Sequence, residues 1–151
     1  MNPKVYVETT IVSYLSAAPS RDIVLAAHQQ LTREWWARRQ CFDLFVSRPV
    51  WDEASRGDAE AAAKRLAALD GIPVLLVSNE GLEFADRLLA TTILPVKAAT
   101  DALHVAIAVL SGMDYLHGTV RTSPMRRFVA GSSRPVEPRV SKHRSFVRPK
   151  N

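Results

Sequence analysis

Three carboxylates occupy positions in the sequence where an acidic side chain needs an explanation. Glu8 follows the apolar run KVYV, and parallel strands bind ligands at their carboxyl ends. Asp101 belongs to the segment AATDALHVAIAVL, which is apolar almost all round and has His104 as its other ionisable residue. Glu53 stands in the segment that follows Pro49. If these carboxylates converge at one end of a parallel sheet, their repulsion calls for a cation, and their hard oxygen donors favour Mg²⁺ or Mn²⁺.

Each carboxylate also has a structural explanation. Glu8 could be a charge at a strand end that reaches solvent. Thr100 could cap its helix and leave Asp101 in a first turn, where the helix dipole favours anions. The same dipole would explain Glu53 early in its own helix. Singly, each residue is explained better by structure, and only the set of three points to a metal site.

The chain lacks the sequence motifs of several other common enzyme chemistries. The sequence has no GxxxxGK[ST], GxGxxG or GxSxG motif, so it signals neither a phosphate-binding loop nor a nucleophile elbow. The four histidines form no HxH or HxxxH pair, which argues against a zinc site. The single cysteine, Cys41, excludes an intramolecular disulfide framework, and we expect it to be a small, partly buried apolar residue.

The order of the expected elements predicts an α/β domain. Apolar and β-branched runs predict strands over 4–8, 42–47 and 72–77 and a fourth strand that starts at Asp114. Helical periodicity predicts helices over 11–15, 21–40, from 49 onward, 58–69, 80–90 and 97–110. Within 21–40, the expected buried stripe is Val24, Ala27, His28, Leu31 and Trp35. Because two strands are apolar on both faces, we expect a central parallel sheet covered by helices on both sides.

Charge and composition divide the chain near residue 116. Its 151 residues suit one domain, and no apolar run is long enough to span a bilayer or resembles a signal peptide, so we expect a cytoplasmic protein without a membrane partner. Residues 1–116 carry 11 Lys and Arg against 14 Asp and Glu, a balance of −3. Residues 117–151 carry 9 against 1, a balance of +8, with four prolines and no periodicity. The sequence therefore predicts a folded domain over 1–116 and a basic, disordered tail over 117–151.

Three segments resemble the PIN domain family in residue types, order and spacing: VYVETTIVSYL, SRPVWDEA and KAATDALHVAIA. The resemblance covers about residues 3–116 and points to the VapC-like branch that has Glu-Thr-Thr at the first acidic position. It implies a three-layer α/β/α nuclease fold and cleavage of RNA with Mg²⁺ or Mn²⁺. It also implies a toxin that a cognate antitoxin neutralises, and it allows a homodimer. Matched position by position, Glu8, Glu53 and Asp101 are the first three acidic, metal-binding positions, and Thr9 is the small polar residue beside the first.

The sequence departs from the family pattern after Leu116. There the family continues into a Thr-Trp-Asn-like motif with a fourth polar site residue, then a helix and a last strand, so the sheet is expected to be truncated after its fourth strand. Codons for His117–Arg126 with two bases dropped permit Trp-Asn-Cys-x-His-Ile-Ala-Asn-Ala, the string that the family pattern expects. We interpret 117–151 as a frameshifted read-through, and the alternative is a natural basic tail that assists RNA binding. A catalytically impaired PIN-fold module that only binds RNA or a partner protein is the second functional hypothesis.

Overall fold

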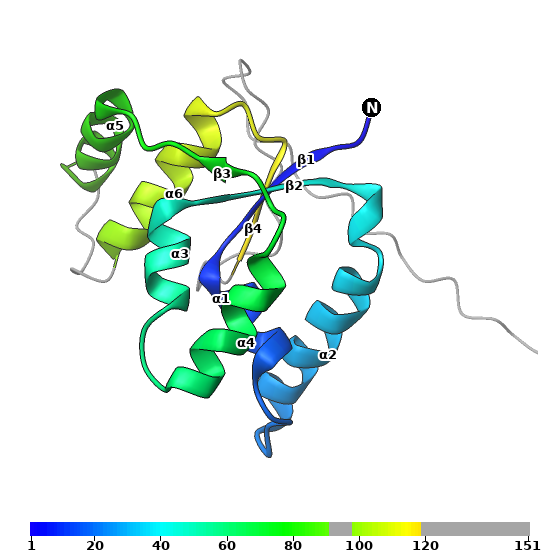
Figure 1. The fold of residues 1–151 in the computed structure, drawn as a ribbon. Coiled ribbons are helices and arrows are strands. Elements are labelled where there is room, and N and C mark those ends of the chain that lie inside the picture. The colour runs from blue at the N-terminus through cyan, green and yellow to red at the C-terminus, as the bar shows by residue number, and fades with distance from the viewer. Residues whose placement is uncertain (91–97, 119–151) are drawn as a thin grey trace, which may run out of the picture.

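A four-stranded parallel sheet forms the centre of the molecule. The computed structural model describes residues 1–90 and 98–118 (Figure 1). The strands are β1 (Lys4–Val7), β2 (Asp43–Ser47), β3 (Val74–Leu75) and β4 (Tyr115–His117). They lie in the order β3-β2-β1-β4, and every neighbouring pair is parallel. The predicted α/β class with a central parallel sheet is confirmed.

Helices connect the strands. They are α1 (Thr9–Ser16), α2 (Ile23–Ala37), α3 (Arg48–Ala54), α4 (Ala59–Leu69), α5 (Asn79–Ala90) and α6 (Ala98–Leu110), with a 3₁₀ turn over Arg39–Cys41. Local sequence explains several of their starts: the carboxylates of Asp22 and Asp58 accept backbone N–H groups at the starts of α2 and α4, and Pro49 lies in the first turn of α3. Over the residues that the structure describes, no helix has the length and apolar content needed to cross a membrane.

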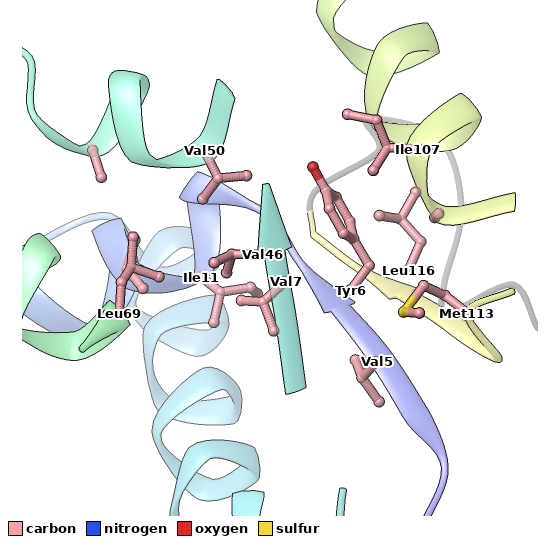
Figure 2. Packing of buried hydrophobic residues seen from close by; sticks show 13 residues of the cluster. Val5, Tyr6, Val7, Ile11, Val46, Val50, Leu69, Ile107, Met113 and Leu116 are labelled. Carbon is pink, nitrogen blue, oxygen red and sulfur yellow. The ribbon is translucent and has the colours of Figure 1, made fainter. Parts of the chain in front are cut away.

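The sheet separates two layers of helices. Figure 1 shows α1, α2 and α4 grouped on one side and α5 with α6 on the other. In β1, Tyr6 faces Ile107 of α6, while Val7 lies with Ile11 of α1 on the opposite side (Figure 2). These residues belong to one core cluster and are at most 3% exposed. Alternating side chains of β1 thus tie both helix layers to the sheet.

The third strand is shorter and more exposed than the sequence predicts. The apolar run over 72–77 contributes only Val74 and Leu75 to the sheet. Val74 is 45% exposed and Leu76 is 89% exposed, so the prediction of a strand buried on both faces is wrong here. The reason is position, because within residues 1–90 and 98–118 β3 lies at the edge of the sheet and pairs with β2 alone.

Helix α2 presents a different face to the core from the one predicted. Val24, Ala27, His28 and Leu31 are exposed, and of the predicted stripe only Trp35 packs against the core. The buried residues of α2 are Gln29 and Thr32. Gln29 can be buried because its amide bonds the backbone of the preceding loop, at Ala18 and Ser20.

Cys41 is exposed, which corrects the expectation of a partly buried residue. The sequence predicts one helix that continues to Gln40 and leads directly into a strand. Instead, α2 ends at Ala37, and a 3₁₀ turn carries Cys41 over the surface before β2 begins.

The fourth strand begins at Tyr115, one residue after its predicted start, and includes His117, the first residue of the predicted tail. Val7 pairs with His117, and the Glu8 N–H donates to the His117 carbonyl. Asp114 lies at the opposite end of the strand, where its carboxylate accepts the Lys4 N–H. The predicted tail beyond residue 118 and its frameshift interpretation lie outside the described residues, so both stay predictions.

Candidate active site

All four residues predicted from the sequence line one pocket. The pocket has a volume of about 330 Å³ and lies where β1 ends and α1 begins, beside the end of α3 and the first two turns of α6. It is lined by Glu8, Thr9, Thr10, Glu53, Thr100, Asp101 and His104. The side chains come from the β1–α1 junction, from α3 and from α6, segments that are far apart in the sequence. The parallel sheet brings them together because the carboxyl ends of its strands share one edge.

Glu8 is buried rather than reaching solvent, so its structural explanation is wrong. It occupies the N-cap position of α1, but its carboxylate makes no capping hydrogen bond. The residue is 4% exposed, and its Oε1 atom is buried without a hydrogen-bond partner among the described residues. Burial, followed by the nearby carboxylates of Asp101 and Glu53, raises the pKa of Glu8 to about 7. A buried carboxylate oxygen without a partner is destabilising, and a cation would relieve that cost.

Glu53 lies in the last turn of its helix, which rules out the dipole explanation. Helix α3 spans only Arg48–Ala54, so Glu53 stands near the end that carries partial negative charge. Its carboxylate is oriented instead by Thr9, whose hydroxyl donates to Glu53 Oε2 with an O–O distance of 2.5 Å. Thr9 therefore connects the start of α1 to the end of α3 within the pocket.

Asp101 lies in the first turn of α6, so the helix dipole still contributes to its placement. The capping role expected for Thr100 is wrong, because α6 begins at Ala98 and Thr100 is an exposed residue inside the first turn. The dipole does not explain why Asp101 faces two further carboxylates. Both residues line the pocket, and the charge of Asp101 is the second largest cause of the raised pKa of Glu8.

Sequence reasoning missed His104 as a pocket residue. It lies one turn after Asp101 on α6 and is 2% exposed. Its Nδ1 atom is 2.7 Å from the Tyr6 hydroxyl, and its Nε2 atom is 3.8 Å from Glu53 Oε2. The available signal was the spacing of three residues from Asp101, which places both side chains on the same face of a helix.

The carboxylates suit a divalent cation in their chemistry, but they do not already stand at metal-binding distances from one another. Over residues 1–90 and 98–118, no three His, Cys, Asp or Glu side chains already stand together as a metal-binding group. Mutual repulsion between carboxylates explains a more open arrangement. The donor set consists of hard oxygen atoms, and the buried Oε1 of Glu8 lacks a partner in the described residues, so the residues present suit Mg²⁺ or Mn²⁺. Their role as ligands stays a prediction.

Comparison with known proteins gives a structural relative. No family model and no curated protein matches the chain. Among solved structures, the chain is similar to the crystal structure of VapC20 from Mycobacterium tuberculosis, a toxin that cleaves the sarcin–ricin loop. The TM-score is 0.58 at 20% sequence identity, over 74% of this chain and 86% of that one. The fold is PIN-like. The comparison thus confirms the PIN-like fold that the sequence resemblance implies.

Proposed function

We propose that this PIN-like chain is a metal-dependent endoribonuclease and the toxin of a type II toxin–antitoxin system. In this role it acts in the cytoplasm, and a cognate antitoxin protein neutralises it. The observation that carries the proposal is the buried Glu8 carboxylate, which shares a pocket with Glu53 and Asp101 at the carboxyl ends of the strands. The structural likeness to VapC20, a toxin that cleaves the sarcin–ricin loop, supports RNA as the substrate.

The pocket residues would have different roles in phosphodiester cleavage. Glu8 and Asp101 would be the principal ligands of Mg²⁺ or Mn²⁺, and Glu53 would complete the site directly or through a water. Such a cation, when bound, lowers the pKa of a water and neutralises charge on the phosphate oxygens. The contacts of Glu53 with Thr9 and His104 both go to Oε2, which leaves Oε1 to orient the attacking water.

The test is RNA cleavage by purified protein with Mg²⁺ and with an excess of chelator. We expect cleavage that requires the metal. Asp101→Asn is expected to abolish cleavage and weaken Mg²⁺ binding with little change in melting temperature, because relief of carboxylate repulsion offsets the lost contacts. Asp86→Asn on the exposed face of α5 is the matched control and should cleave like the unmodified protein. Cleavage that persists in chelator would contradict the proposal, and unfolding of Asp101→Asn would assign Asp101 a structural role.

A catalytically impaired PIN-fold module is the second candidate. The observation in its favour is that no three metal-ligating side chains form a finished group in the described residues. Such a module would bind RNA or a partner protein without cleaving RNA. Fluorescence anisotropy with labelled RNA separates the two functions, since the module predicts binding without cleavage at every Mg²⁺ concentration.

A further inference from the structure

A chain of buried polar side chains leads from the core to Glu53 in the pocket, and two of its members, Tyr6 and Ser47, have no part in the reaction described above. Ser47, at the end of β2, is fully buried, and its Oγ is 2.6 Å from the Tyr6 hydroxyl. The same hydroxyl is 2.7 Å from Nδ1 of His104. Nε2 of that ring faces Glu53 Oε2 at 3.8 Å. The chain therefore runs from the core of the sheet to a carboxylate in the pocket.

The chemistry of the partners fixes the direction of the hydrogen bonds. The His104 ring has one nitrogen towards each partner, Nδ1 towards the Tyr6 hydroxyl and Nε2 towards Glu53 Oε2. A carboxylate can only accept, which favours the proton on Nε2 and leaves Nδ1 as an acceptor. With Nδ1 as the acceptor, the Tyr6 hydroxyl donates to it across 2.7 Å. Ser47 makes no capping bond at the start of α3, and its hydroxyl donates to the Tyr6 oxygen.

Glu53 needs such support because its surroundings repel it. It lies at the C-terminal end of α3 and shares the pocket with the carboxylates of Glu8 and Asp101. Thr9 holds Oε2 from one side by a hydrogen bond. The 3.8 Å from His104 is too long for a direct hydrogen bond, but the N–H dipole still attracts the oxygen in this buried setting.

We propose that His104 is a positioning residue, held by Tyr6 and Ser47, whose Nε2–H draws Glu53 Oε2 away from the other carboxylates and directs Oε1 into the pocket. The inference rests on the proposed nuclease function and deepens it. It assigns three buried polar residues, from β1, β2 and α6, to the support of one carboxylate. Outer-shell partners of this kind typically change metal affinity or activity by about 10- to 100-fold.

Substitutions with matched controls test the proposal in the full chain. His104→Leu should weaken Mg²⁺ binding, measured by calorimetry with Mg²⁺ alone, by about 10- to 100-fold and slow RNA cleavage at saturating RNA to a similar extent. His104→Gln, which can place an amide N–H near the position of Nε2, should recover most of the loss. Tyr6→Phe should act in the same direction with a smaller effect. The controls His28→Leu on α2 and Tyr14→Phe on α1 lie outside the pocket and should leave both measurements unchanged.

A spectroscopic measurement on the unmodified protein keeps the proposal falsifiable if a variant fails to fold. Nitrogen-15 NMR of the histidine rings should show His104 with its proton on Nε2, the nitrogen that faces Glu53. A proton on Nδ1 would overturn the proposal, as would folded His104→Leu protein with unchanged Mg²⁺ affinity and cleavage. If the unmodified protein neither binds Mg²⁺ nor cleaves RNA, the nuclease function fails, while the tautomer still decides the orientation of His104.

Discussion

At the scale of single residues, the burial of Glu8 is the most informative observation. An ionised carboxylate is rarely enclosed unless a partner compensates its charge. Around Glu8 are two further carboxylates, Asp101 and Glu53. Their negative charge adds to the effect of burial and raises the pKa of Glu8 further. Such a residue lowers the stability of the metal-free protein, so its placement is better explained by ligand binding than by folding.

Replacement of Glu8 by glutamine should therefore stabilise the metal-free protein at high pH. The pKa of Glu8 rises from 4.5 to about 7 on folding, so its stabilising contribution is complete below pH 4.5 and is lost as the pH rises through 7. From pH 5 to pH 8, the free energy of unfolding of Glu8→Gln should increase relative to that of the unmodified protein, by on the order of 3 kcal/mol. Urea denaturation in chelator across this range measures the difference.

The comparison must be made between the two proteins at each pH. Burial lowers the pKa of His117 to about 4, so acid also destabilises the fold through this ring, and the difference cancels that effect. Addition of Mg²⁺ at pH 8 should raise the melting temperature of the unmodified protein and not that of Glu8→Gln. A pH-independent difference, or an equal response of both proteins to Mg²⁺, would contradict the account of Glu8.

At the scale of elements, the pocket depends on how the ends of β1 and β4 meet. The His117 carbonyl accepts the Glu8 N–H, and the His117 ring packs on Trp35 with ring centroids 4.1 Å apart. The chain then passes so close to Glu8 that a Cβ atom at Gly118 would overlap the Glu8 carboxylate. Glycine at this position thus gives the Glu8 side chain its room.

Gly118→Ala should displace the Glu8 carboxylate and so impair the site more than the fold. We expect Mg²⁺ affinity to fall at least tenfold, in line with the loss of a positioned ligand, while the melting temperature changes by only a few degrees. Calorimetry and thermal denaturation supply the two values. Gly57→Ala, at an exposed turn with open space around it, is a control for substitution of a glycine, although its own positive φ of 85° will reduce stability slightly. Unchanged affinity in Gly118→Ala would show that Glu8 does not need its observed position.

The elements also show which features could be predicted from the sequence. The convergence of Glu8, Glu53 and Asp101 was predictable, because it follows from the shared carboxyl edge of parallel strands. The buried face of α2 was not, because Gln29 is buried through bonds to a distant loop backbone that periodicity does not encode. Nor was the environment of His104, which depends on a contact with Tyr6, 98 positions earlier in the chain. Long-range partners decide such details.

At the scale of the whole molecule, the distribution of charge constrains how RNA could be held. Residues 1–116 have a net charge of −3, which does not by itself attract a polyanion. A divalent cation bound among the three carboxylates would offset most of their negative charge and offer the phosphate a positive contact where it must lie. Under the proposed nuclease function, the metal would therefore assist substrate binding as well as the chemistry.

Restoration of the alternative reading frame after codon 116 should stabilise the molecule. In the described residues β4 lies at the edge of the sheet and pairs only with β1, and the restored sequence would add a helix and a strand. The melting temperature should rise by several degrees, since a gain of about 1 kcal/mol suffices for that in a domain of this size. Scanning calorimetry of both versions measures the shift. Equal melting temperatures and equal RNA cleavage would contradict the frameshift interpretation.

Anomalous diffraction from crystals soaked in Mn²⁺ can show whether Glu8, Glu53 and Asp101 form one divalent-cation site. We expect an anomalous peak in this pocket, within about 2.1 Å of oxygen atoms of Glu8 and Asp101, with Glu53 in direct or water-mediated contact. The same peak should be absent from crystals of Asp101→Asn. A pocket without a peak at saturating Mn²⁺, or a peak that persists in Asp101→Asn, would contradict the claim.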